Sequence, residues 1–286
     1  MPELLHHQDT FFGYLTVQRL ERVASDDAAQ STAFDELAGR LWHRLPATIG
    51  EHDILLATQA FDTGLSARCP ALDTEQRCSV HFDKKPAICR VVPFDALRPD
   101  NLQHRVLSDR AAEAQYLGSD CIAPGQRDGF AVVTRRLSVV NDDARQALAA
   151  RRRDLASERR FWGNAVFQML RAELFADASR LAQVPSNGFL SLSLAPVLMV
   201  LADASPRSRA RCLSYLEAQA RLATDMLLAA SAAGQSERAE FRQLRAFAGT
   251  NARLHALLVA APPPLTSLPS SERVALDRWL GLEVSP

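Results

Sequence analysis

Residues 62–106 are the stretch that most limits how this chain can fold. They contain four prolines and a single glycine, and they show no sustained 3.6-residue hydrophobic period. Such a segment forms loops, and a loop region of this length needs an anchor other than a hydrophobic stripe. The stretch also holds three of the five cysteines, and a fourth follows at Cys121. A metal bound by thiolates would supply the anchor.

The spacing of the four cysteines indicates which metal centre they would hold. Eight residues separate Cys69 from Cys78, ten separate Cys78 from Cys89, and thirty-one separate Cys89 from Cys121. None of these forms the C-x2-C pair typical of zinc ribbons and fingers. An iron–sulfur cluster is bulkier and accepts wider spacing. We therefore predict that the four thiolates bind a [4Fe–4S] cluster, with zinc as the alternative metal.

Arginine lies next to three of these cysteines, as Arg68, Arg77 and Arg90. Positive side chains beside sulfur stabilise thiolates and offset the negative charge of a thiolate-bound cluster. We predict that these arginines contact the cofactor, and the alternative is that they face water. His81 follows Cys78 by three residues and is either a substitute ligand for a thiolate or a surface loop histidine.

The fifth cysteine, Cys212, lies in a different environment. It shares a helical stripe with Leu216, Ala223 and Leu227. A free cysteine in such a position behaves as a small hydrophobic residue, so we predict that it belongs to the core.

Composition and charge limit the class of protein. Hydrophobic residues make up 47% and charged residues 23% of the chain, which is typical of a globular protein. The 33 basic residues balance the 33 acidic ones, so no global field favours nucleic acid. The first residues do not resemble a signal peptide, and the longest apolar stretch, residues 188–202, is interrupted by Pro196 and serines. We expect a cytoplasmic protein without membrane contact, where thiols stay reduced.

Hydrophobic periodicity predicts a mainly α fold. Helices are expected at residues 28–45, 108–117, 190–203, 206–233, 236–260 and 270–280. Residues 141–182 are expected to form one helix, or two that break near Gly163, with Asn141 as the N-cap. Residues 15–24, 52–61 and 130–140 could each include a strand. We predict a loop-rich cysteine domain with N-terminal helices at residues 1–140 and a helical bundle at residues 141–286.

The sequence CPALDTEQRCSVHFDKKPAICRVVP, residues 69–93, resembles the YkgJ-type cysteine-cluster proteins, a zinc- or iron-chelating family that includes flagellin lysine N-methylases. The matching positions are Cys69, Pro70, Leu72, Cys78, Ser79, Val80, Pro86, Cys89, Arg90 and Pro93. For the methylases, the resemblance implies S-adenosylmethionine and protein-lysine methylation. Family members also carry an upstream C-x2-C…CC element, whereas no cysteine precedes Cys69 in this chain.

These observations predict a metal-binding protein that acts in redox chemistry or in the modification of a peptide or protein substrate. The alternatives are a zinc-stabilised interaction module without catalysis and an S-adenosylmethionine-dependent protein-lysine N-methyltransferase. Catalytic residues are not assigned, because the sequence shows no Ser–His–Asp arrangement, nucleophile elbow or glycine-rich nucleotide loop.

Overall fold

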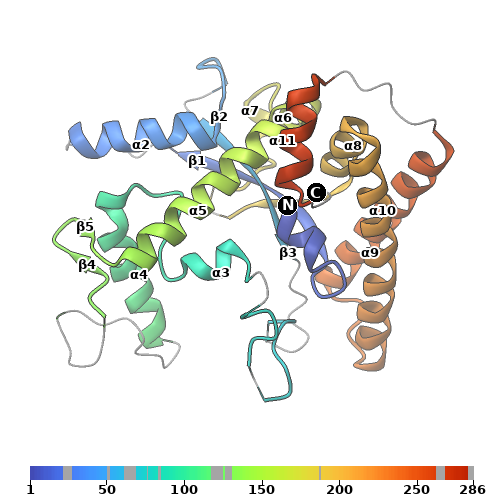
Figure 1. Cartoon of the computed structure of the whole chain (residues 1–286), viewed down its shortest axis with the longest axis horizontal. Coiled ribbons are helices and arrows are strands. Elements are labelled where there is room, and N and C mark those ends of the chain that lie inside the picture. The colour runs from blue at the N-terminus through green and yellow to red at the C-terminus, as the bar shows by residue number, and fades with distance from the viewer. Residues whose placement is uncertain are drawn as a thin grey trace. The chain divides into compact units, whose positions relative to one another are not determined.

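The computed structural model divides the chain into two compact units that alternate along the sequence. Figure 1 labels the helices and strands of the chain. Unit 1 comprises Met1–Glu21, Leu45–Lys84 and Glu158–Pro286, and unit 2 comprises Arg22–Arg44 and Lys85–Ser157. The structure describes residues 1–21, 28–49, 52–60, 69–75, 77–82, 85–116, 125, 131–186, 188–261 and 268–282.

Helices dominate both units, which confirms the prediction of a mainly α fold. Unit 1 contains α1 (Pro2–His6), β1 (Gly13–Glu21), β3 (His52–Ala60), the π-helical segment η2 (Arg159–Gly163), α6 (Asn164–Leu174), α7 (Ala178–Leu181), β6 (Leu190–Ser193), α8 (Ala195–Ala204), α9 (Pro206–Ala232), α10 (Ala239–Ala260) and α11 (Ser270–Trp279). Unit 2 contains α2 (Ala28–Leu41), β2 (His43–Arg44), α3 (Ala87–Val91), the 3-10 turn η1 (Asp100–Leu102), α4 (Gln103–Tyr116), β4 (Thr134–Arg135) and β5 (Ser138–Val139). Helix α5 (Asp142–Glu158) belongs to unit 2 except for its last residue.

An antiparallel sheet lies at the centre of unit 1, with β1 between β3 and β6. Strand β1 pairs with β3 over its full length, from Gly13↔Ala60 to Glu21↔His52. It pairs with β6 from Tyr14↔Ser193 to Val17↔Leu190. The segments at residues 15–24 and 52–61, for which the sequence allowed either a helix or a strand, therefore include most of strand β1 and all of strand β3, respectively.

The helix predicted over residues 190–203 is wrong in its first four residues, which form strand β6. The sequence of the strand, LSLS, alternates apolar and polar residues with the two-residue period of a strand, and the helix begins only at Ala195. Pro196 lies in the first turn of α8, where a missing backbone N–H costs nothing.

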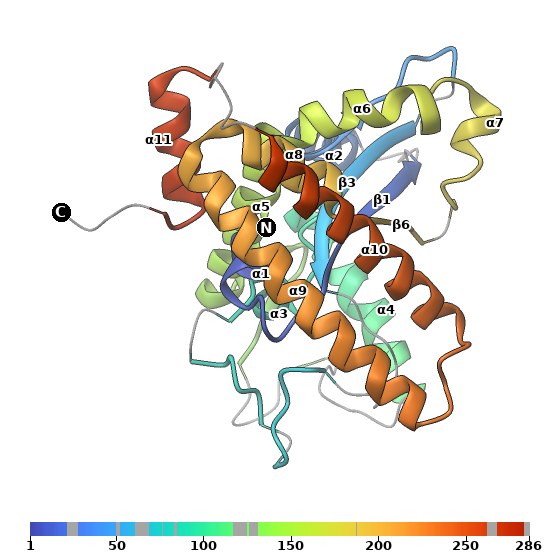
Figure 2. The ribbon, with the colours of Figure 1, turned by 90° about the vertical axis from the view of Figure 1, so that its right-hand side faces the viewer.

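Both faces of the first half of β1, residues 13–17, are buried, because its side chains enter two different hydrophobic clusters. Leu15 and Val17 join the larger cluster with residues of α8 and the first half of α9. Tyr14 joins a second cluster with residues of α10 such as Phe241 and Leu244. Figure 2 shows α9 and α10 side by side and the three strands next to one another.

The N-terminal end of β1 fits closely against α9. A Cβ atom on Gly13 would lie 2.2 Å from the hydroxyl oxygen of Tyr215, so only glycine fits at this position. The Gly13 amide donates a hydrogen bond to Oε1 of Gln219 at 2.8 Å. The side-chain amide of Gln219 donates in turn to the carbonyls of Gln8 (2.8 Å) and Phe11 (3.0 Å). One buried glutamine thus fixes the chain that leads into the sheet.

Helix α5 begins as predicted and continues through η2 into α6. Oδ1 of Asn141 accepts a hydrogen bond from the Ala144 amide at 2.9 Å, which confirms Asn141 as the N-cap. The π-helical turn ends at Gly163, where sequence analysis expected a break. Glu158, just before this turn, is fully buried and accepts a 2.5 Å hydrogen bond from the Thr58 hydroxyl of β3.

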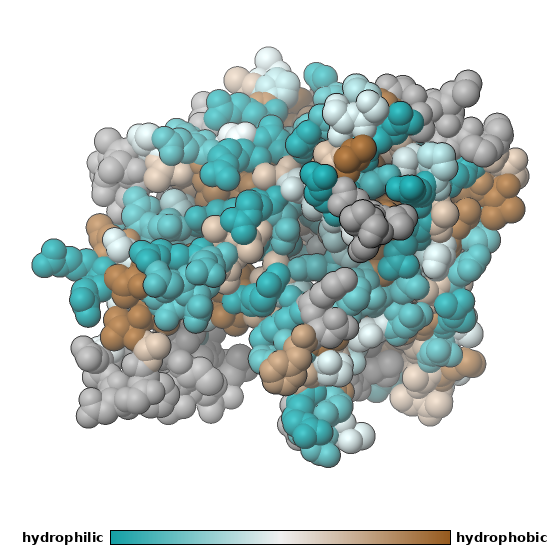
Figure 3. Space-filling view, viewed as in Figure 1, coloured by the Kyte–Doolittle hydropathy of each residue, from teal (hydrophilic) through white to brown (hydrophobic). Residues whose placement is uncertain are grey.

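Polar residues dominate the face of the molecule in Figure 3, where hydrophobic residues form small separate groups. Within the described ranges, no helix is both long enough and apolar enough to cross a bilayer.

Candidate metal centre

Cys69 and Cys78 lie on one short hairpin of unit 1, which we call the cysteine hairpin (residues 69–75 and 77–80). The Leu72 amide donates a hydrogen bond to the Cys69 carbonyl at 3.0 Å, and Leu72 also pairs with Cys78 in an antiparallel bridge. The backbones of both cysteines therefore contact the same residue. Two further bonds close the hairpin, because the amide and the hydroxyl of Ser79 both donate to the Ala71 carbonyl at 2.8 Å.

The cysteine hairpin is anchored on the hydrophobic core of unit 1. Ala71 and Val80 are buried in the larger cluster, and the half-buried Cys78 packs against it. Cys69 is exposed. The anchor fixes the base of the hairpin while one thiol stays accessible to a ligand from solvent.

Asp73 organises the tip of the hairpin. Its Oδ1 accepts hydrogen bonds from the amides of Glu75 (2.9 Å) and Arg77 (2.8 Å), and its Oδ2 accepts one from Nε of Arg77 at 3.2 Å. Hydrogen bonding, led by the Arg77 amide, lowers the pKa of Asp73 below its usual 3.8 against an opposing desolvation effect. The guanidinium of Arg77 also contacts the Glu75 carboxylate at 2.9 Å, so it lies on carboxylates of its own loop.

Cys89 and Arg90 lie on the short helix α3 of unit 2. Their amides donate to the Pro86 carbonyl at 2.9 and 3.0 Å, which forms the first turn of the helix. Ala87 and Val91 face inward and are buried, whereas Cys89 and Arg90 are exposed.

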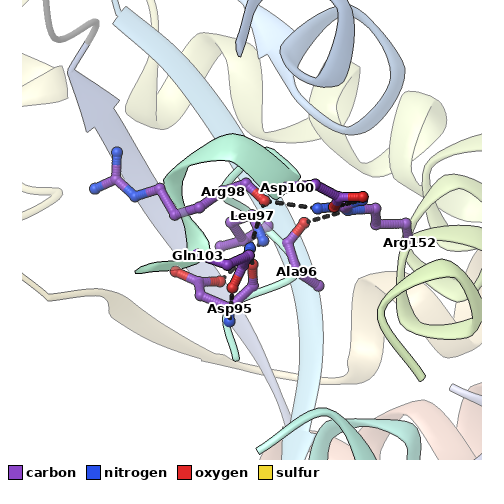
Figure 4. A network of polar contacts seen from close by, with 7 residues as sticks. All are labelled: Asp95, Ala96, Leu97, Arg98, Asp100, Gln103 and Arg152. Atoms are coloured by element: carbon purple, nitrogen blue, oxygen red, sulfur yellow. Dashed lines mark hydrogen bonds and ion pairs between the residues drawn. The ribbon is translucent and has the colours of Figure 1, made fainter. Parts of the chain in front are cut away.

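The loop that follows α3 is held by two side chains from helices of unit 2, as Figure 4 shows. Gln103 of α4 is fully buried, and its amide nitrogen donates to the carbonyls of Asp95 (2.7 Å) and Arg98 (2.8 Å). Its Oε1 accepts a hydrogen bond from the Asp95 amide at 3.0 Å.

Arg152 of α5 holds the same loop from the other side. It donates to the carbonyls of Ala96 (3.1 Å) and Arg98 (2.6 Å) and pairs with the Asp100 carboxylate at 2.8 Å. Side chains thus replace the regular backbone hydrogen bonds that this loop lacks.

The structure brings together only some of the predicted site residues. Cys69 and Cys78 share the hairpin, Cys89 and Arg90 belong to the other unit, and Arg68 and Cys121 lie outside the described residues. Within the part of the chain that the structure describes, no three His, Cys, Asp or Glu side chains gather closely enough to hold a metal ion.

Two further residues from the sequence analysis can now be placed. The ring of His81 lies edge-on to Phe82, with centroids 4.7 Å apart. Cys212 is fully buried in the core of unit 1, which confirms its predicted position. Burial raises the pKa of the Cys212 thiol to about 12, so the thiol stays protonated at neutral pH and is a poor metal ligand.

Sequence reasoning missed the residues that support the cysteines. An aspartate in a proline-rich loop often accepts hydrogen bonds from amides two or more residues ahead, and this signal could have identified Asp73. Gln103 and Arg152 gave no such signal, because their partners are set by the tertiary fold.

Comparison of the chain with models of protein families, with curated proteins and with solved structures gives no match. The geometry and chemistry of the chain's own residues therefore carry the functional argument.

Proposed function

We propose that this protein binds a metal centre through the cysteine hairpin, and that the centre is a [4Fe–4S] cluster with Cys69, Cys78, Cys89 and Cys121 as ligands. The observation that carries the proposal is the shared contact of Cys69 and Cys78 with Leu72. Cysteines with eight residues between them in the sequence are thereby held on one small, core-anchored element. Two thiolates on a rigid element lower the ordering cost of binding a soft metal.

The chemistry of the surrounding residues supports an anionic cluster. Thiolates close together repel one another unless a cation lies between them. Arg68 and Arg90 are the proposed cationic neighbours, and Arg90 is exposed beside Cys89. Arg77 is engaged with Asp73 and Glu75, so its proposed contribution to the cluster is the weakest of the three.

Such a cluster would serve redox chemistry or the modification of a peptide or protein. A structural zinc site in a non-catalytic interaction module is the second candidate. The anchoring of the hairpin through Ala71 and Val80 supports it, because a structural metal joins a loop to a folded core. Methylation with S-adenosylmethionine stays a prediction from the family resemblance alone.

Metal analysis of protein purified without oxygen tests the proposal. Iron and acid-labile sulfide together with broad absorption at about 400 nm are expected for a [4Fe–4S] cluster, whereas a colourless protein with stoichiometric zinc would favour the second candidate. Cys69→Ser and Cys78→Ser should each lower the metal content. Cys212→Ala is the matched control, because it removes a thiol that is buried and protonated, and it should retain the metal.

Two outcomes would overturn the proposal. The first is full metal content in both hairpin variants, and the second is equal metal loss in Cys212→Ala. Cys89→Ser, measured alongside, tests whether the thiol on α3 takes part. Metal loss in this variant supports the four-ligand cluster, and full retention excludes Cys89 from the ligand set.

A further inference from the structure

We infer that Asp73 is the positioning residue of the cysteine hairpin, and that it sets the orientation of Cys78 through Arg77. This inference rests on the proposed function, because it names the residue that prepares the hairpin for a metal. Neither the cysteine pattern nor the family resemblance includes Asp73.

Asp73 holds Arg77 by three different groups. The Arg77 amide donates to Oδ1 of Asp73 at 2.8 Å, and the Arg77 side chain donates to Oδ2 at 3.2 Å. The Asp73 amide donates in return to the Arg77 carbonyl at 2.9 Å. That carbonyl belongs to the peptide group that leads directly into Cys78. The backbone amide of Asp73 thus holds this peptide directly, and the Asp73 side chain holds the turn that brings Arg77 back to that amide.

The opposite side of Cys78 is fixed as well. Cys78 pairs with Leu72, and Ser79 donates both its amide and its hydroxyl hydrogen bond to Ala71. Cys78 thus lies between two restrained peptide groups, and Leu72 in turn contacts the Cys69 carbonyl. Ligands that are oriented before the metal arrives bind it more tightly, because less chain entropy is lost on binding.

The hydrogen bonds of Asp73 favour a positioning role over direct coordination of a metal. Oδ1 accepts two amide hydrogen bonds, and Oδ2 accepts the guanidinium hydrogen bond. A carboxylate oxygen offers about two lone-pair sites, so both sites of Oδ1 and one of the two on Oδ2 are occupied by hydrogen bonds within the hairpin. Asp73 also faces the tip of the hairpin through residues 75 and 77. We therefore assign it to support of a ligand.

Three variants of the full-length apo protein test this role with Co²⁺ alone as the probe. Asp73→Ala removes all side-chain acceptors, Asp73→Asn keeps a neutral oxygen acceptor, and Glu75→Gln removes only the outer ion pair with Arg77. Loss of a residue that orients a metal ligand typically costs about 10- to 100-fold in affinity. We expect a loss of about tenfold or more for Asp73→Ala, a smaller loss for Asp73→Asn, and wild-type affinity for Glu75→Gln.

A second measurement, hydrogen exchange of the metal-free proteins, detects positioning without any metal. The amides of Glu75 and Arg77 should exchange faster in Asp73→Ala than in the wild type, because both donate to Asp73. Weaker Co²⁺ binding with unchanged exchange would mean direct coordination and would overturn the inference.

The failure of this inference is distinguishable from the failure of the proposed function. Unchanged Co²⁺ affinity in Asp73→Ala, with binding lost in Cys78→Ser, overturns the positioning role and leaves the metal site in place. Equal Co²⁺ binding by wild type and Cys78→Ser overturns the proposed function itself.

Discussion

The close fit between Gly13 and Tyr215 makes Gly13→Ala a sharp test of how β1 packs on α9. The added Cβ would lie 2.2 Å from the Tyr215 hydroxyl oxygen, 2.7 Å from Cδ1 of Leu194 and 3.0 Å from Cδ1 of Leu4. Tyr215 is 0% exposed, so its ring has no route into solvent. The new methyl group must therefore displace buried atoms.

The expected cost follows from two opposing effects. Overpacking of a well-packed core costs about 1–3 kcal/mol, and a contact this short with a fully buried ring belongs in the upper half of that range. Replacing glycine by alanine in a strand recovers about 0.5–1 kcal/mol of chain entropy. The free energy of unfolding should therefore fall by about 2 kcal/mol.

Urea unfolding followed by circular dichroism measures this loss as a lower midpoint at an unchanged m-value. Tyr215→Phe provides the control, because it removes the obstructing oxygen while keeping the buried ring. Alone it should change the stability by less than about 1 kcal/mol. In the double variant, the loss should be about 1–2 kcal/mol smaller than the sum of the single losses. Additive losses, or a Gly13→Ala variant as stable as the wild type, would refute the reasoning.

Three further predictions concern titration and polar support. Because the folded structure lowers the pKa of Asp73 from 3.8, the Asp73 carboxylate stabilises the hairpin above pH 3.8, and this contribution is lost as the pH falls through the lower folded pKa. An NMR titration of the Asp73 carboxyl carbon should therefore have its midpoint below pH 3.8. A midpoint above pH 3.8 would contradict the prediction. Gln103→Leu should destabilise the loop 95–100 by about 2 kcal/mol, since three hydrogen bonds are lost and the Asp95 amide is left without its acceptor. Unchanged amide exchange in this loop would count against the role of Gln103. The Cys212 thiol, with its pKa raised to about 12, should resist a thiol reagent at pH 8 while the exposed Cys69 reacts, and equally rapid labelling of both would disprove it.

Local signals in the sequence predicted the helices well. The 3.6-residue period and the stop signals placed α9, α10 and α11 within about three residues of their observed ends. The Asn141 cap and the acidic residues after it marked the start of α5, because capping depends on neighbours in the same turn. Helix α2 ends at Leu41, earlier than expected, and β2 begins two residues later.

Features that depend on distant partners were not predictable in the same way. Strand β6 was assigned to a helix because its residues continue into the apolar sequence of α8, whereas its partner β1 lies far away in the chain. The alternation of two units along the sequence likewise leaves no trace in periodicity.

The same distinction between local signals and distant partners applies to the candidate site. The cysteines and their adjacent arginines could be identified from residue type and spacing. The contacts of Arg152 with Ala96 and Asp100 span 56 and 52 residues, so no window of sequence could show them. The pairing of Arg77 with Asp73 spans four residues and was within reach of an argument from turn chemistry.

The hydrogen bond between Gly13 and Gln219 joins residues that are 206 positions apart, and this separation has a consequence for biosynthesis. On the ribosome, the first strand emerges long before the helix whose glutamine receives it, and long before its neighbour β6. A nascent chain must therefore carry β1 with one unpaired edge until most of the protein has been translated. Such an exposed edge invites aggregation and suits capture by a chaperone, so unit 1 should acquire its native sheet only late in synthesis.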